Sequence, residues 1–244
     1  MATSEPILTL HTLPAVWGLP SLSPACAKLE TWLRLAEIPY EVSTRLDMAN
    51  APKGKVPFIE YRGEMLGDST LIIERLRRDL GVDPDAGLSK VHRAISIAFR
   101  RLLKEQVYWH MVDQRYGETN WPQHRPALAA LLHPEMSAAD ANARTDQFRD
   151  EVLGQMHGHG IGRHTTAELL ILAGADFGAL ADYLDSKPFF FGERPTTVDA
   201  TIFGYLGNII RPPYDHPVRE IARSHRNLVA LIERMSARFF PELA

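Results

Sequence analysis

Two patterns of apolar residues alternate over about the first eighty positions. Short continuous runs are typical of strands, and residues repeated every three or four positions are typical of helices. Short runs bounded by turn residues predict strands, and the two runs on either side of Arg62-Gly63 predict a hairpin. The predicted order is strand, helix, strand, then strand, strand, helix, which indicates a small α/β domain. The expected elements are 7–10, 24–36, 40–44, 56–61, 64–66 and 69–80.

Both predicted helices carry a start signal. Ser23 is a natural N-cap, and Pro24 is a favoured first helical residue because proline holds φ near its helical value. Ser69 is expected to cap the second helix in the same way.

The pattern changes after a linker at residues 81–87, which is rich in glycine, proline and aspartate. Beyond it apolar faces at helical spacing dominate, and no run makes a convincing strand. Thr196 and Asp199 precede an apolar run and form a capping box, in which each side chain bonds the other's backbone N–H. We therefore expect an α/β domain at residues 1–82 and an all-α domain at residues 88–244.

Composition narrows the function classes. The chain is 45% apolar and 23% charged with a net charge of -3, so it has no electrostatic footprint for nucleic acid. No apolar run is long enough to span a bilayer, and residues 1–10 lack the features of a secretory signal. A single cysteine excludes an internal disulfide and fits a reducing compartment. The expected location is therefore cytoplasmic.

Three short motifs stand in order within the first seventy residues: Ser23-Pro24-Ala25-Cys26, Lys55-Val56-Pro57-Phe58 and Asp68-Ser69. This order resembles the glutathione transferase superfamily, and the resemblance covers nearly the whole chain. Several stretches are similar to one branch, the failed-axon-connections and metaxin-like proteins and their bacterial relatives. These are 21–24, 28–34, 52–57, 67–73, 160–164, 226–228 and 233–235. The resemblance implies a thioredoxin-like N-terminal domain, an all-α C-terminal domain and a cleft for glutathione as co-substrate.

In that family the position of Ser23 activates the thiol. A hydroxyl donor and the positive end of a helix both stabilise a thiolate, which is the nucleophilic form of glutathione. The plain alternative is that Ser23 only caps the helix, and the two roles are compatible. Cys26 stands at the second cysteine of a glutaredoxin-like motif whose first cysteine is replaced by Ser23, which disfavours redox catalysis.

The resemblance assigns the tripeptide to the other two motifs. Pro57 is implied to follow a cis peptide bond, which leaves the backbone of Val56 free to pair with glutathione as an added strand. Asp68 and Ser69 are implied to hold the γ-glutamyl end, and Lys55 lies near the expected glycyl carboxylate. The alternatives are a trans proline on an edge strand, a helix cap and a solvated lysine.

The helix that walls the electrophile pocket in this family carries Tyr108, Trp109 and Val112 here, and Trp17 lies in a long loop that could overhang the cleft. Such aromatic clusters also serve as core, so both interpretations stay open. His157, His159 and His164 lie in a Gly-rich stretch that we expect to be a loop, and no cysteine or acid completes a metal site.

Two functions follow from these observations. The first is a glutathione-binding transferase that conjugates the thiol to small apolar electrophiles. The second is a transferase-like binding or adaptor module without catalysis. The sequence leaves a homodimer open, and indicates neither a nucleic-acid partner nor a membrane span.

Overall fold

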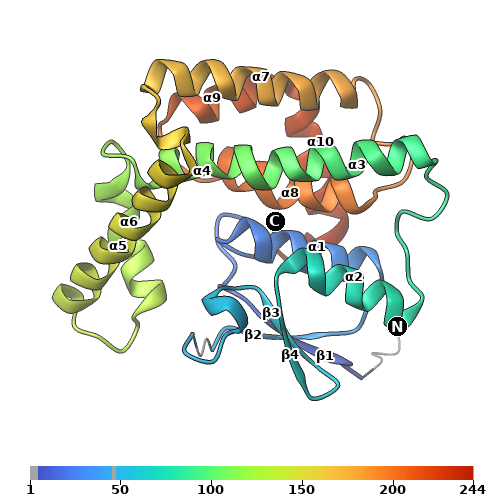
Figure 1. Ribbon diagram of the computed structural model, residues 1–244, viewed down its shortest axis with the longest axis horizontal. Coiled ribbons are helices and arrows are strands. Elements are labelled where there is room, and N and C mark those ends of the chain that lie inside the picture. The colour runs from blue at the N-terminus through green and yellow to red at the C-terminus, as the bar shows by residue number, and fades with distance from the viewer. Residues whose placement is uncertain (1–4, 46–47, 244) are drawn as a thin grey trace.

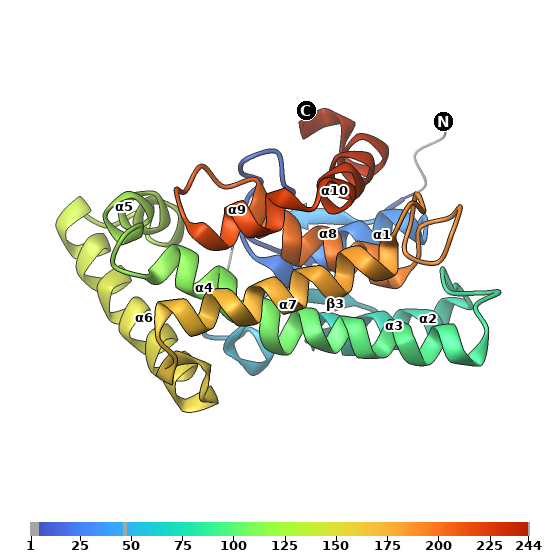
Figure 2. The ribbon, with the colours of Figure 1, turned by 90° about the horizontal axis from the view of Figure 1, so that it is seen from above.

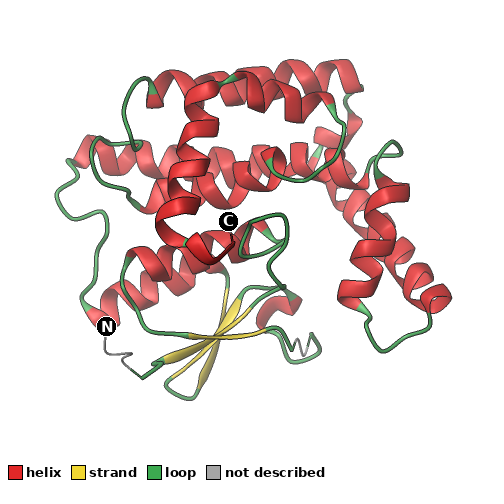
Figure 3. Cartoon of the chain, turned by 180° about the vertical axis from the view of Figure 1, so that it is seen from behind, coloured by secondary structure: helices red, strands yellow, loops and turns green. Residues whose placement is uncertain are grey.

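The computed structural model describes residues 5–45 and 48–243, and its N-terminal domain contains a four-stranded sheet (Figure 3). The strand order is β2-β1-β3-β4, with β1 parallel to β2 and the other two pairs antiparallel. The strands are β1 (Leu8–His11), β2 (Glu41–Ser43), β3 (Phe58–Tyr61) and β4 (Glu64–Gly67).

Two helices cover one face of this sheet, α1 (Pro24–Leu35) and α2 (Ser69–Leu80). Their apolar side chains share one core with the inward side chains of β1 and β3, as the helical and alternating spacing predicts. Figure 1 shows both helices between the sheet and the C-terminal helices. The core residues include Leu8, Leu10, Leu29, Trp32, Leu33, Ile59, Ile72, Ile73 and Leu76.

The C-terminal part is mostly helical and is arranged around α8, which is buried along its whole length (Figures 1 and 2). Figures 1 and 2 both show α5 and α6 projecting at one end of the molecule. The helices are α3 (Lys90–Leu102), α4 (Tyr108–Tyr116), α5 (Trp121–Leu132), α6 (Ala138–His159), α7 (Thr166–Leu184), α8 (Thr197–Ile210), α9 (Pro217–Ser224) and α10 (Arg226–Phe239). Short turns are Pro52–Gly54, Ile161–Arg163 and Pro241–Leu243.

Helices α3 and α4 are continuous through a π-helical turn, Leu103–Val107. A π-turn adds a residue to the helix, and such turns are common at functional sites. This turn carries Lys104 and directly precedes Tyr108 and Trp109.

Helix α8 holds α1 in place by close backbone contact. A Cβ built on Gly204 would lie 2.6 Å from the carbonyl oxygen of Pro24 and 2.7 Å from the amide nitrogen of Lys28. Only glycine allows this approach. The Trp32 indole, in the last turn of α1, also donates to the Thr197 hydroxyl at 3.2 Å, so α1 is held against α8 near both of its ends.

Most of the predicted elements are present within two residues of their expected bounds, and the capping box of Thr196 and Asp199 forms. Two expectations are wrong. The N-cap of α2 is Asp68, whose carboxylate accepts from the first-turn amides, and Ser69 is the first helical residue. His157 and His159 lie in the last turn of α6, which continues through its glycines and ends only at Gly160.

Candidate functional site

The sheet register brings the three motifs to one end of the sheet. Phe58 pairs with Gly67, so the residues just before β3 and just after β4 are neighbours. His11 pairs with Phe58 from the other side, which places the end of β1 at the same edge. The loop before α1 is tied to this edge because the Thr12 hydroxyl donates to the Ser21 hydroxyl at 3.2 Å.

Ser23 lies half-buried at the start of α1 and its hydroxyl remains available. Its Oγ accepts one long hydrogen bond, 3.4 Å from the Cys26 amide, as the predicted N-cap. The Cys26 side chain also lies within hydrogen-bonding reach of the Ser23 hydroxyl. A hydroxyl can cap a helix with a lone pair and donate its proton to an anion, so both roles are open to Ser23.

A buried network fixes the loop behind Ser23. The Arg115 guanidinium donates to the carbonyl of Leu22 at 2.8 Å and to the side chain of Asn208 at 2.6 Å. Asn208 in turn donates to the carbonyl of Ser21 at 3.3 Å, and Ser21 Oγ accepts from the Ser23 amide at 3.2 Å. Burial lowers the pKa of Arg115 to about 10, which leaves it a cation near neutral pH.

The second motif has the geometry that the resemblance implies. The Val56-Pro57 peptide bond is cis. Within the described part of the chain, neither the N–H nor the C=O of Val56 makes a hydrogen bond. Lys55 and Lys53 are exposed next to this segment, and Pro57 itself is buried.

The third motif is built around a strained backbone. Asp68 has φ of 74°, a left-handed value that is uncommon for any residue but glycine. Its Oδ1 accepts from the amides of Thr70 at 2.8 Å and Leu71 at 3.2 Å, and its Oδ2 lies 3.4 Å from the Lys104 amine. Although burial raises the pKa of the Asp68 carboxyl, these amides and Lys104 lower it overall, so the group is ionised near neutral pH.

Sequence reasoning missed Lys28 as a site residue. It projects from α1, is only 3% exposed, and donates to the hydroxyls of Ser69 at 3.2 Å and Thr70 at 3.0 Å. Burial, and secondarily the Arg100 charge, lower the pKa of the Lys28 amine to about 7. A buried amine with hydroxyl partners therefore lies next to the Asp68-Ser69 motif.

The four candidate pocket residues lie in different settings. Tyr108 and Trp109 are partly buried and meet edge to face with ring centres 4.9 Å apart. Val112 is fully buried in the helical core. Trp17 is partly buried and packs against Tyr214, with ring centres 5.4 Å apart.

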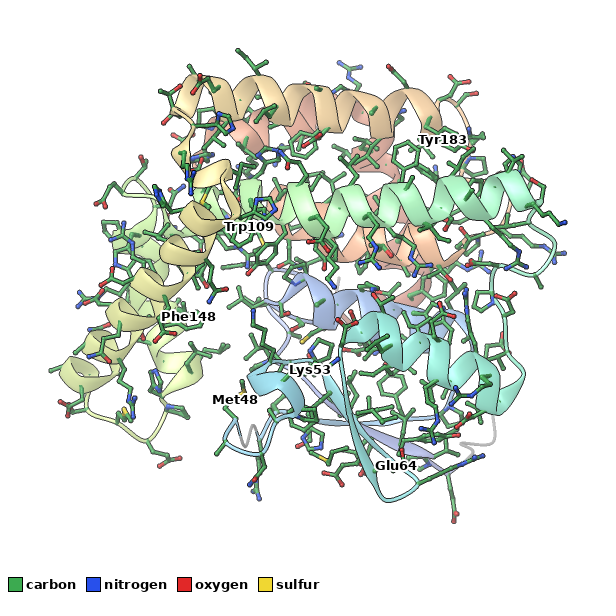
Figure 4. All side chains as sticks on the ribbon, viewed as in Figure 1. Met48, Lys53, Glu64, Trp109, Phe148 and Tyr183 are labelled. Atoms are coloured by element: carbon green, nitrogen blue, oxygen red, sulfur yellow. The ribbon has the colours of Figure 1, made fainter. Side chains whose placement is uncertain are left out.

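Figure 4 shows Trp109 near the junction of α4 and α6, and in that view Lys53 lies below it on the N-terminal domain. Trp109 also meets the His159 ring, with ring centres 5.2 Å apart. Aromatic surface from α4 and the end of α6 therefore gathers at one place on the helical domain.

Cys26 is fully buried on α1, and burial raises the pKa of its thiol, which keeps it in the unreactive form. Over residues 5–45 and 48–243, no cluster of three or more histidine, cysteine or acidic side chains has metal-binding geometry. No helix in that same part of the chain is both long and apolar enough to cross a bilayer.

Two family models match the chain. Residues 24–122 match the glutathione S-transferase N-terminal domain, and residues 173–235 match the glutathione S-transferase C-terminal domain. Together they span both halves of the fold.

Several relatives align over most of the chain. Isoprene-epoxide–glutathione S-transferase of Rhodococcus sp. (strain AD45) is 31% identical over 242 residues, 96% of this chain and 99% of that protein. Failed axon connections of Drosophila melanogaster is 31% identical over 248 residues, 97% of this chain and 59% of that protein. Metaxin-2 of Homo sapiens is 25% identical over 229 residues, 89% of this chain and 82% of that protein.

Solved structures share the architecture. A glutathione S-transferase of Ceriporiopsis subvermispora in complex with glutathione superposes with a TM-score of 0.60 at 20% identity, covering 94% of this chain and 97% of that chain. At this identity the likeness supports the fold alone.

Proposed function

Since the chain belongs to the glutathione transferase superfamily, we propose that it binds reduced glutathione and transfers its thiol to small apolar electrophiles. The observation that carries the proposal is the meeting of Ser23, Val56-Pro57 and Asp68-Ser69 at one end of the sheet. The transferase that aligns over 96% of the chain supports the activity.

The tripeptide is bound by backbone and charge. The free N–H and C=O of Val56 pair with the cysteinyl unit as an extra strand would. The γ-glutamyl carboxylate meets the Ser69 hydroxyl and the N-terminus of α2, and the ammonium meets the Asp68 carboxylate. Lys55, which is exposed beside Val56, attracts the glycyl carboxylate.

The chemistry needs a thiolate. The Ser23 hydroxyl donates to the sulfur and the N-terminus of α1 adds a favourable potential, so the proton leaves the thiol to solvent at lower pH than in free glutathione. The sulfur lone pair then bonds to the electrophilic carbon, while the electron pair of the broken bond leaves with the departing group. Tyr108 and Trp109 supply apolar surface for the electrophile, the buried Val112 supports them on the same helix, and Trp17 of the long loop adds a further aromatic side chain.

A second function is a binding or adaptor module of the same fold without catalysis. The observation that favours it is that Failed axon connections and Metaxin-2, whose names state no transferase reaction, align over most of the chain. Both functions use the same fold, so turnover separates them.

The deciding experiment measures conjugation of glutathione to a generic aryl halide by the parent and by Ser23→Ala. One hydrogen bond to an anion contributes about 1.5–3 kcal/mol, so Ser23→Ala should lower the rate at saturating glutathione by about tenfold or more. Ser137→Ala, which removes the N-cap hydroxyl of α6, is the matched control and should turn over like the parent. No turnover by the parent would favour the adaptor, and equal rates for parent and Ser23→Ala would limit Ser23 to capping.

A further inference from the structure

A cavity of about 320 Å³ lies between α2 and α3, on the far side of α2 from the sheet. Six basic side chains line it and only two acidic ones do. Both acids pair with Arg77, and Asp85 also accepts from the Thr197 amide. Arg93, Arg101 and Lys104 pair with acids outside the lining, which leaves Arg100 without an acidic partner among the described residues. The basic residues are Lys28, Arg77, Arg93, Arg100, Arg101 and Lys104.

Several donors in this cavity have no partner. Ser96 is 2% exposed, and its Oγ makes no hydrogen bond to any described residue. The Nε of Arg77 is likewise buried without a partner. Across the described ranges, the Arg100 guanidinium makes no side-chain hydrogen bond or ion pair, although it is partly buried. Buried donors normally have partners, so these groups are suited to an acceptor from outside the chain.

The cavity extends beyond the proposed tripeptide site. It reaches along α3 from Lys104, which contacts Asp68, to Arg93, a distance of roughly 16 Å at the rise of an α-helix. A single carboxylate would satisfy only the end near Thr70. Arginine forks bind phosphate and carboxylate oxygens in pairs, so the cavity fits an anion with several charges.

We propose that the cavity between α2 and α3 binds a small polyvalent oxyanion, through the free Arg100 guanidinium and the buried Ser96 hydroxyl, separately from the tripeptide site. The buried Lys28 also lines the cavity, and its amine adds positive charge when it is protonated. This site is a property of the chain beyond the proposed transferase activity.

The test is titration calorimetry of the full chain with pyrophosphate at physiological ionic strength, with citrate as a second probe. We expect saturable binding of pyrophosphate that persists at saturating glutathione. Stronger binding of pyrophosphate than of citrate would show that the site prefers phosphate. Equal binding would show that the site selects for charge alone. Either result supports the proposal. No saturable binding of either probe, or competition with glutathione, would overturn it.

Substitutions locate the site. Arg100→Gln should weaken pyrophosphate binding by about tenfold or more, because it removes a charged donor pair. Arg100→Lys keeps the charge but loses the paired N–H donors of the guanidinium. It should weaken pyrophosphate binding less than Arg100→Gln does, and it should preserve the fold. Arg78→Gln, at a side chain that is 71% exposed on α2 outside the cavity, is the matched control and should bind like the parent. Equal losses in Arg100→Gln and Arg78→Gln would show a general charge effect and contradict the site.

Discussion

Asp68 combines a structural and a proposed binding role, and two substitutions separate them. Asp68→Asn keeps a side-chain oxygen for the amides of Thr70 and Leu71, and asparagine tolerates a left-handed φ as well as aspartate does. It removes only the negative charge. Asp68→Ala removes the charge, the cap and the side chain that makes the φ of 74° tolerable.

The structure sets the expected magnitudes. Loss of the cap costs about 1 kcal/mol, and an alanine at left-handed φ costs about 1 kcal/mol more. Asp68→Ala should therefore lower the melting temperature by about 4–8 °C in a protein of this size. Asp68→Asn loses only a partly exposed pair with Lys104, of about 0.2–1 kcal/mol, and should melt within about 4 °C of the parent.

Glutathione affinity should follow the charge instead. A hydrogen bond to a charged group contributes about 1.5–3 kcal/mol, so both variants should bind glutathione about tenfold to a hundredfold more weakly. The assays are thermal unfolding and glutathione calorimetry on each variant. Asp79→Asn, at the other end of α2, is the control for loss of an acid and should keep its affinity. Parent-like affinity in Asp68→Asn would refute the assignment of the ammonium to Asp68.

Two further predictions concern the packing around α1. Gly204→Ala should destabilise the fold by about 1–3 kcal/mol and lower glutathione affinity, because the new Cβ would clash with backbone atoms of Pro24 and Lys28. Denaturant unfolding measures this loss, and an unfolding midpoint equal to that of the parent would contradict the close contact. The pKa of Lys28, about 7 in the folded chain and 10.5 as its ordinary value, means that unfolding takes up a proton between these pH values. The measured quantity is the unfolding free energy of the parent minus that of Lys28→Met. This difference should rise by about 1 kcal/mol per pH unit from roughly pH 7 to 9. A difference that does not change with pH would show that the amine is not desolvated.

The periodic elements could be predicted because they depend on local pattern. The helix at Pro24 follows from its cap and apolar spacing, and the hairpin follows from two apolar runs about Arg62-Gly63. The order of three motifs predicted the family, because those motifs fall at fixed points of one topology. The cap of α2 was missed by one residue, since Asp68 and Ser69 are both good N-caps and only the backbone geometry decides between them.

Contacts between distant residues could not be predicted. Lys28 donates a hydrogen bond to Ser69, 41 residues away in the sequence, and Arg115 donates one to the carbonyl of Leu22, 93 residues away. Nothing near either residue in the sequence marks it as buried, since lysine and arginine are usually exposed. The candidate pocket residues of α4 show the same thing: Val112 lies in the core while Trp109 keeps some exposed surface, and only helix packing decides between the two.

Binding of reduced glutathione is the central claim, and titration calorimetry of the parent chain with reduced glutathione tests it most directly. We predict saturable heat at millimolar glutathione or below, and displacement by a glutathione analogue whose sulfur is methylated, because the backbone of Val56 and the Asp68-Ser69 motif hold the peptide rather than the sulfur. The absence of both heat and displacement at millimolar concentration would contradict the claim and leave a transferase fold without its co-substrate.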